Sequence, residues 1–285
     1  MSRILITGTS GFIGHHFAQS MAQNHDVLCI SRKPTEVEGV TAIQGDFTSP
    51  DVWADEKAGF TNQIDVLIHL AAVTGGGTEA TQLSVNVLGT HQLLRHLIER
   101  GCKKFVLASS IAAVGFQSPL FRPLQLPMPD EHPCLDRVGY GFSKYMMEEV
   151  TRYLSRQNDE LDFINIRLAS IAPDDRKLTP RKAGPVTEWA MGSISYMYLS
   201  DTVRCFTVAA ETRHKPGVRI MNAVGTQACA EDTVPEIIRG WYGSDADKID
   251  LSHYERPGHE RDPVFEIDRI KEELGFIPER SVLGE

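Results

Sequence analysis

A glycine-rich turn between an apolar run and a helical pattern constrains the fold more than any other feature of this sequence. Residues 3–7 are a short apolar run, residues 8–14 read Gly-Thr-Ser-Gly-Phe-Ile-Gly, and residues 12–23 carry a helical pattern. Further short apolar runs follow along the chain, at residues 26–30, 41–44, 65–70, 104–108 and 162–167. Helical segments separate several of these runs, and strands that alternate with helices indicate βαβ units with right-handed crossovers. The sequence therefore predicts an α/β fold with a doubly wound parallel sheet.

The glycine turn has the chemistry of a phosphate-binding loop. Such a turn lets backbone amides approach a pyrophosphate, and the N-terminus of the following helix favours its negative charge. The spacing is G-x-x-G-x-x-G rather than the G-x-G-x-x-G of other dinucleotide folds. Three glycines alone could form a simple tight turn, but their place between a strand and a helix favours a dinucleotide site. The predicted contacts are Gly8, Ser10, Gly11, Phe12, Ile13 and Gly14.

The end of the second predicted strand bears on which nicotinamide cofactor is bound. An acidic residue there hydrogen-bonds the ribose hydroxyls of NAD, whereas an arginine accommodates the 2′-phosphate of NADP. Residues 31–33 read Ser-Arg-Lys, without a carboxylate. A basic pair in a loop is often only solvated surface, but its place directly after this strand favours a phosphate role. We predict that Arg32 and Lys33 help to bind NADP, with NAD as the possible alternative.

Three residues have the chemistry of a proton-transfer site. Ser110 follows the apolar run 104–108, and Tyr140 and Lys144 lie four residues apart in a helical stretch. Residues at this spacing share a helix face, so a protonated Lys144 is expected to lower the pKa of the Tyr140 phenol. A phenol tuned in this way exchanges a proton with a substrate oxygen, which the Ser110 hydroxyl orients. Any Tyr-x-x-x-Lys can be an ordinary helix surface, but the serine and the glycine turn favour catalysis.

Composition narrows the class of protein. The net charge of −9 over 285 residues argues against a nucleic-acid surface. The five cysteines are scattered, which is typical of a reducing compartment. The first residues run straight into a strand pattern, and no uncharged apolar run approaches the ~20 residues of a membrane span. The histidines form no metal-binding spacing, so we predict no metal site. We expect a cytoplasmic protein that acts on a small molecule, without nucleic acid or membrane.

The alternation of strands and helices loosens after residue 167, which suggests a second domain. Prolines, glycine and several charges interrupt residues 173–190, a pattern of irregular structure. We predict a dinucleotide-binding domain over residues 1–168, with Ser110, Tyr140 and Lys144, and mainly a small substrate-binding lobe over 169–285. Residues 199–225 are expected to return to the first domain.

The sequence resembles the extended short-chain dehydrogenases/reductases, also called the NAD-dependent epimerase/dehydratase family. The resemblance covers nearly the whole chain and rests on the glycine turn, the Ser/Tyr/Lys set and the C-terminal Leu-Gly-Phe-x-Pro. It implies a Rossmann-type fold with a small C-terminal lobe, and a homodimer formed through the helices at 83–98 and 140–157. It also implies further cofactor contacts from Asp46, Phe47, Leu70, Ala71 and Ala72.

Departures from the family pattern restrict the activity. Dehydratases of the family carry an Asp-Glu pair where this chain has Ile111 and Ala112, which disfavours dehydration. Ser170 stands where nucleotide-sugar members have an asparagine, and the segment from Pro173 to Asp201 is short for a nucleotide diphosphate pocket. The arrangement is more similar to the compact uronate dehydrogenase-like branch, although Ile111 and Arg32 depart from that branch.

Three functions remain open at this stage. The leading hypothesis is hydride transfer between NADP(H) and a carbonyl or secondary alcohol of a small polar, sugar-like substrate. Tyr140 would deliver the proton, Ser110 would hold the oxygen, and Lys144 would tune the phenol and bind the nicotinamide ribose. The alternative is a nucleotide-sugar epimerase with transient oxidation by bound NAD, and the third is a non-catalytic NADP(H) sensor. The predicted substrate contacts are Thr74, Ile111, Ser170, Arg176 and Trp189.

Overall fold

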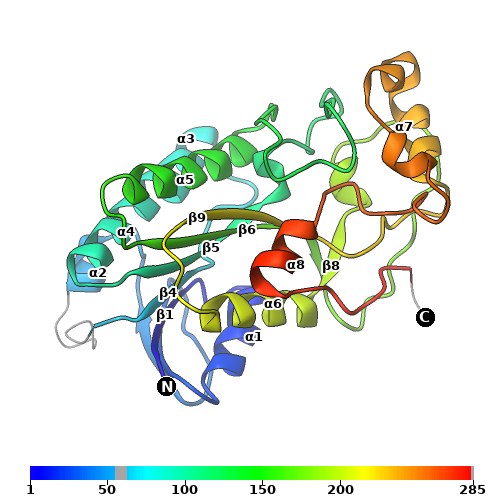
Figure 1. Ribbon diagram of the computed structural model, residues 1–285. Helices are drawn as coiled ribbons and strands as arrows, with labels where there is room; N and C mark the ends of the chain where they lie inside the picture. The colour runs from blue at the N-terminus through cyan, green and yellow to red at the C-terminus, as the bar shows by residue number, and fades with distance from the viewer. Residues whose placement is uncertain (55–62, 284–285) are drawn as a thin grey trace. The chain divides into compact units, whose positions relative to one another are not determined.

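A seven-stranded sheet organises the chain, in the order β3-β2-β1-β4-β5-β6-β9 (Figure 1). The computed structural model describes residues 1–54 and 63–283. The strands are β1 (Arg3–Thr7), β2 (Asp26–Ser31), β3 (Val40–Gln44), β4 (Val66–His69), β5 (Lys104–Ser110), β6 (Asp162–Leu168) and β9 (Gly217–Ala223). Every residue of β4, β5 and β6 is buried, as expected for strands covered by helices on both faces. The predicted doubly wound parallel sheet is confirmed.

The strand register decides where a ligand site can form. Thr7 of β1 is level with Ile30 of β2 and with His69 of β4, and both pairings are parallel. The carboxyl ends of these three strands therefore meet at one edge of the sheet. The strand order reverses at β1, because the chain leaves β3 on one side of β1 and places β4 on the other. In open α/β sheets, ligands bind at such a switch point.

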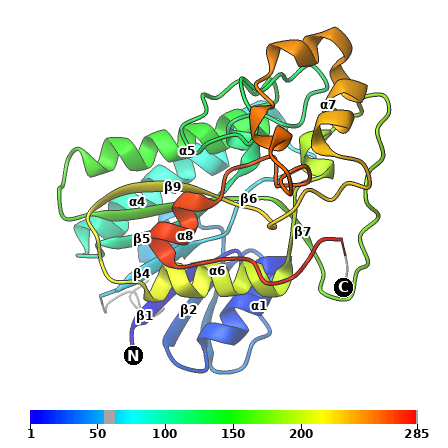
Figure 2. The ribbon, with the colours of Figure 1, turned by 45° about the vertical axis from the view of Figure 1, so that its right-hand side comes forward.

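Helices cover both faces of the sheet (Figures 1 and 2). Helices α1 (Phe12–Met21) and α6 (Leu199–Glu211) lie on one face, where Phe17 and Phe206 meet edge to face with ring centroids 6.0 Å apart. Helices α4 (Thr90–Glu99) and α5 (Gly139–Ser155) lie on the other. None of the helices in the described ranges is both long and apolar enough to cross a membrane.

Several element bounds differ slightly from the predicted ones. The helix expected over 83–98 starts as a π-helical segment at Leu83–Gly89 and continues as α4. The helix expected over 140–157 is α5, which covers Gly139–Ser155. Two short helices, α2 (Pro50–Ala54) and α3 (Glu79–Gln82), lie in connections that the sequence pattern did not resolve.

The chain folds into two compact units that are interleaved along the sequence. The first unit contains Met1–Ser109, Ser143–Ile166 and Val203–Ile220. The second contains Ser110–Phe142, Arg167–Thr202 and Met221–Glu285. The predicted division near residue 168, with residues 199–225 returning to the first domain, stays a prediction.

The second unit has its own core and its own small sheet. Strands β7 (Ser170–Ala172) and β8 (Tyr196–Tyr198) pair in parallel, and α7 (Val234–Tyr242) buries Ile237 and Ile238 in the core. Helix α7 starts with a capping box between Thr233 and Glu236, a Thr-x-x-Glu signal that our sequence analysis missed. The unit also contains α8 (Asp268–Leu274), which buries Ile270 and Leu274.

Candidate functional site

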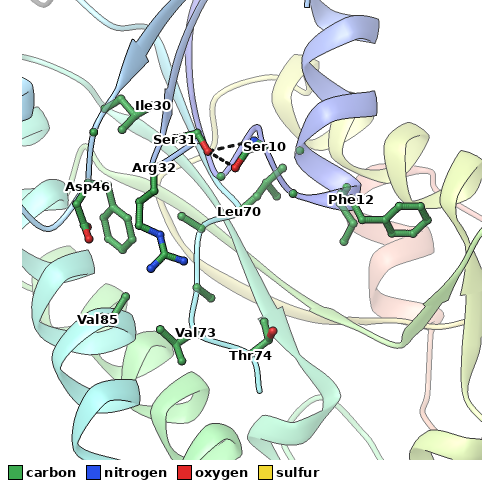
Figure 3. Close-up of a pocket in the computed structure, with 18 residues that line it drawn as sticks. Ser10, Phe12, Ile30, Ser31, Arg32, Asp46, Leu70, Val73, Thr74 and Val85 are labelled. Carbon is green, nitrogen blue, oxygen red and sulfur yellow. Dashed lines mark hydrogen bonds between the residues drawn. The ribbon is translucent and has the colours of Figure 1, made fainter. Parts of the chain in front are cut away.

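A pocket of about 360 Å³ lies in the first unit at the carboxyl ends of β1, β2 and β4 (Figure 3). It is lined by Gly8, Ser10, Gly11, Phe12, Ile13, Gly14, Ile30, Ser31, Arg32, Gly45, Asp46, Phe47, Leu70, Ala71, Ala72, Val73, Thr74 and Val85. The predicted cofactor residues of the turn, of β2 and of the 46–47 and 70–72 segments thus surround one cavity. Lys33, Tyr140 and Lys144 are not among its lining residues.

The glycines of the turn are required by backbone packing. Gly8 has a φ of 81°, and a Cβ there would lie 2.8 Å from the Ala71 nitrogen. A Cβ on Gly14 would lie 2.8 Å from the Gly8 carbonyl carbon and closer still to its oxygen. Helix α1 starts after Gly11 with no side-chain cap and no acidic residue in its first turn. Its first amides are therefore left for an anionic ligand, so the turn fits the pyrophosphate of a nicotinamide dinucleotide.

Ser31 holds the glycine turn from the end of β2. Its hydroxyl accepts a hydrogen bond from the Ser10 amide at 3.1 Å and donates one to the Ser10 hydroxyl at 2.6 Å (Figure 3). Both serines line the pocket. Ser31 is a pocket residue that was not predicted from the sequence. The only feature that could have indicated it is its place as a small polar residue at the strand end, beside Arg32.

Arg32 extends its guanidinium into the pocket, whereas the Phe12 ring points away from it (Figure 3). Across residues 1–54 and 63–283, no acidic side chain forms an ion pair with Arg32. Asp46 also faces the pocket, and its Oδ1 accepts hydrogen bonds from the amide and the hydroxyl of Thr48 at 2.9 and 2.8 Å. These bonds hold the Asp46 carboxylate in place, so the pocket offers one cation and one oriented carboxylate.

His69 holds the end of β4 beside the pocket. Its Nδ1 hydrogen-bonds the Thr7 hydroxyl at 2.8 Å, and its Nε2 hydrogen-bonds the Thr90 hydroxyl at 2.9 Å. Burial, and to a smaller extent the charge of Lys144, lower the pKa of His69 to about 3. The imidazole is therefore neutral, and it fixes the strand end without titrating near neutral pH.

Ser110 and Tyr140 are hydrogen-bonded to each other in the second unit. Ser110 is the last residue of β5, and its hydroxyl also accepts a hydrogen bond from the Ala112 amide at 3.1 Å. Gly141 lets this turn of α5 pack closely, since a Cβ there would lie 2.6 Å from the Asp136 carboxyl carbon.

The expected lowering of the Tyr140 pKa is not found. Burial raises the pKa of Tyr140 to about 12, and the hydrogen bond from Ser110 offsets only part of this rise. Burial likewise lowers the pKa of Lys144 to about 8, although Glu148 opposes the change. Withdrawal from water penalises both charged forms, so the reasoning from helix spacing alone gave the wrong direction for the phenol.

Lys144 is fixed in the first unit. It is 3% exposed, and its Nζ donates a hydrogen bond to the Ala108 carbonyl at 2.6 Å. The preceding residue, Ser143, accepts a hydrogen bond from Asn86 Nδ2 at 3.0 Å. Asn86 in turn exchanges hydrogen bonds with the Val73 backbone, so it links α5 to the segment that lines the pocket.

The predicted substrate residues lie in different surroundings. Thr74 lines the pocket of the first unit. In the second unit, Ile111 is 1% exposed within the core, and Ser170 donates its hydroxyl to the Gly192 carbonyl at 2.9 Å. Trp189 is 48% exposed, has a φ of 63°, and contacts Phe116 edge to face.

Arg176 lines a second hollow, of about 480 Å³, within the second unit. Its lining residues are Arg176, Lys177, Leu178, Thr179, Pro180, Arg181, Lys182, Ser193 and Tyr196. Lys182 forms an ion pair with Glu231 at 3.1 Å. The other three cations of this hollow form no ion pair with any residue that the structure describes, so the hollow carries uncompensated positive charge.

The spacing rules for metal ligands missed one group in the second unit. Potential ligand atoms of His253, His259 and Asp262 lie within 4.8 Å of one another. Asp262 Oδ2 is 2.7 Å from His253 Nε2 and 2.8 Å from His259 Nδ1, and Arg256 contacts the other nitrogen of His253. These contacts form a hydrogen-bonded cluster on the surface.

Comparison with known proteins places the chain in a family. A model described as the NAD dependent epimerase/dehydratase family matches residues 4–223. The chain is 31% identical over 161 residues to a putative UDP-glucose 4-epimerase of Methanocaldococcus jannaschii, covering 54% of this chain and 51% of the relative. It is 30% identical over 156 residues to the UDP-glucose 4-epimerase of Halalkalibacterium halodurans, covering 52% and 44%. The matched region spans about half the length of these curated relatives.

Solved structures share the whole fold at low sequence identity. The UDP-glucose 4-epimerase of Bifidobacterium longum, in complex with NAD+ and UDP, has a TM-score of 0.71 at 19% identity and covers 99% of this chain and 95% of its own. A mutated uronate dehydrogenase has a TM-score of 0.67 at 17% identity, with 99% and 82% covered. At these identities the likeness concerns the fold alone. The family match spans more than half of the sequence, and the chain therefore belongs to the NAD dependent epimerase/dehydratase family.

Proposed function

We propose that this protein is a sugar epimerase that inverts one hydroxyl-bearing carbon of a nucleotide-linked sugar by transient oxidation with a bound nicotinamide cofactor. The observation that carries the proposal is the Ser110–Tyr140 hydrogen bond, with Lys144 one helical turn further along α5. The sequence alone favoured net hydride transfer. The family membership and the names of the curated relatives support epimerisation instead.

The proposed chemistry assigns one task to each residue. A bound nicotinamide would supply reversible hydride transfer at the sugar carbon. Tyr140 takes the proton of the sugar hydroxyl through its phenolate oxygen and gives it back when the carbon is reduced on the other face. Ser110 donates a hydrogen bond to the same sugar oxygen and keeps it directed at the phenol. Lys144 supplies positive charge that favours the phenolate. Hydride and proton are both returned, so no net oxidation results.

The basic hollow in the second unit supports an anionic substrate. Arg176, Lys177 and Arg181 are exposed and line it together. A phosphate or diphosphate suits such a cluster, since arginine presents paired donors to phosphate oxygens. We infer that this hollow takes the charged part of the substrate.

Incubation with UDP-glucose tests the proposal. We expect formation of the 4-epimer, detected by proton NMR of the anomeric signals, with no accumulation of reduced cofactor at 340 nm. Protein denatured directly after purification should release NAD in stoichiometric amount, because an epimerase regenerates its cofactor in each cycle. Steady accumulation of reduced cofactor, without an epimer, would establish a dehydrogenase instead.

A second candidate function is net hydride transfer with NADP(H), and Arg32 favours it. The end of β2 carries no carboxylate for the ribose hydroxyls of NAD, and the Arg32 guanidinium faces the pocket. An arginine at this place accommodates the 2′-phosphate of NADP. A dehydrogenase must exchange its cofactor, so this candidate predicts a site that is empty after purification and takes up NADPH.

The variant Arg32→Glu separates the two cofactors. If Arg32 binds the 2′-phosphate, the variant should bind NADPH about 10- to 100-fold more weakly, the loss expected for one or two charge-assisted hydrogen bonds. NADH affinity should fall much less. Lys33→Glu is the matched control, because it makes the same charge change at a neighbour that does not line the pocket. Equal loss of NADPH and NADH binding in Arg32→Glu would remove Arg32 from this role. Fluorescence titration gives the affinities.

Two further expectations stay predictions. The resemblance implies a homodimer formed through α4 and α5, and the sequence implies a cytoplasmic location.

A further inference from the structure

A buried carboxylate lies beside the lysine of the proposed site. Glu148 is 0% exposed and follows Lys144 by four residues on α5, so the two side chains share a helix face. Its Oε1 accepts a hydrogen bond from the Ser109 hydroxyl at 2.6 Å. Removing a carboxylate from water is unfavourable unless an opposite charge and hydrogen bonds compensate. A neighbouring positive charge therefore favours the buried carboxylate of Glu148.

The charge of Lys144 meets this need within the first unit. Its Nζ donates to the Ala108 carbonyl of β5, and Glu148 acts on it with an attractive charge. His69 of β4 also interacts with Lys144, and its imidazole is neutral. Burial lowers the pKa of Lys144 to about 8, and Glu148 is the group that opposes the fall. The Lys144 ammonium would therefore lose its proton near pH 8.

The hydrogen bond from Ser109 gives Glu148 a fixed position. Ser109 is 3% exposed and directly precedes Ser110 on β5, while Glu148 lies two helical turns after Tyr140 on α5. The Ser109–Glu148 bond therefore joins the strand and the helix that carry the three residues of the proposed site. The Glu148 side chain is fully buried, so its carboxylate is not a solvated surface charge.

We propose that Glu148 is a positioning residue that keeps the Lys144 ammonium protonated during turnover. It acts through Lys144 and does not touch the substrate. The inference rests on the proposed function, in which the charge of Lys144 favours the Tyr140 phenolate. Without the carboxylate, burial alone acts on the lysine, so its pKa falls and it becomes neutral at a lower pH.

The variant Glu148→Gln tests this role, because it removes the charge and keeps an oxygen that accepts the Ser109 hydrogen bond. We expect the alkaline limb of the pH profile of kcat/KM to move down by about one pH unit or more, which is a tenfold smaller protonated fraction on that limb. Activity well below the new pKa should approach that of the unmodified protein, and KM should change little. Glu148→Asp, which restores the charge, should return the limb most of the way.

Glu149→Gln is the matched control. Glu149 is the next residue of α5, is partly exposed, and pairs with Arg152 on the surface. The variant Glu149→Gln makes the same chemical change at a residue that does not face Lys144. Its pH profile of kcat/KM should therefore match that of the unmodified protein. Equal shifts for both variants, or no shift for Glu148→Gln, would overturn the proposal.

A direct titration of Lys144 separates this inference from the proposed function. Protein labelled with 13C at the lysine ε carbons is titrated by NMR, and the Lys144 signal is assigned by its loss in Lys144→Met. A lower Lys144 pKa in Glu148→Gln than in Glu149→Gln supports the inference even if no epimerisation is found. An unchanged Lys144 pKa overturns it even if the enzyme is an epimerase. If Glu148→Gln does not fold, the same titration on Glu148→Asp and Ser109→Ala should show smaller shifts in the same direction, and unchanged values there would refute it.

Discussion

Replacement of Tyr140 by phenylalanine is expected to lower turnover by about 10²- to 10⁴-fold, the usual contribution of a general acid–base group. The variant removes the oxygen that exchanges the proton and that hydrogen-bonds Ser110, and it leaves the ring. Tyr140 does not line the pocket of the first unit, so cofactor affinity should stay within a few-fold. Steady-state kinetics and a cofactor titration of the same preparation provide the two values.

Tyr153→Phe is the control for this variant. Tyr153 lies on the same helix, is 44% exposed, and loses the same hydroxyl. It should keep near-normal turnover. If Tyr140→Phe also keeps near-normal turnover, then Tyr140 does not transfer the proton and the proposed chemistry is wrong.

Replacement of Gly14 by alanine is expected to weaken cofactor binding by more than about 100-fold, or about 2.7 kcal/mol. The new Cβ would meet the Gly8 carbonyl group, which is backbone and cannot rotate away. The turn must therefore open, and its amides lose their alignment towards the anion. Thermal unfolding should also occur at a lower temperature, since a forced contact in a packed region typically costs 1–3 kcal/mol.

Gly75→Ala is the matched control. A Cβ at Gly75 would meet no described heavy atom within 4 Å, and the φ of Gly75 is not in the left-handed region. This variant should bind the cofactor and unfold as the unmodified protein does. Tight cofactor binding by Gly14→Ala would show that the turn does not hold the pyrophosphate.

The features that depend on near neighbours along the chain could be predicted from the amino-acid sequence. The alternation of short apolar runs with helical patterns predicted the parallel sheet, because each period records which faces of an element are buried. The strand, glycine turn and helix predicted the pocket around Gly8 and Gly14. The spacing of Tyr140 and Lys144 placed both on α5. Each of these conclusions follows from local geometry alone.

The electrostatics of the site could not be predicted from the sequence, because they depend on how distant segments pack together. In the sequence, a glutamate four residues after Lys144 indicates an ordinary exposed ion pair on a helix. The burial of Glu148 depends on β5, whose Ser109 lies 39 residues away in sequence. Burial raises the pKa of Tyr140, against the direction that helix spacing suggested, and burial lowers the pKa of Lys144. The Ser31–Ser10 hydrogen bonds and the core position of Ile111 likewise depend on distant segments. Desolvation is set by everything that surrounds a group, and no local pattern in the sequence records it.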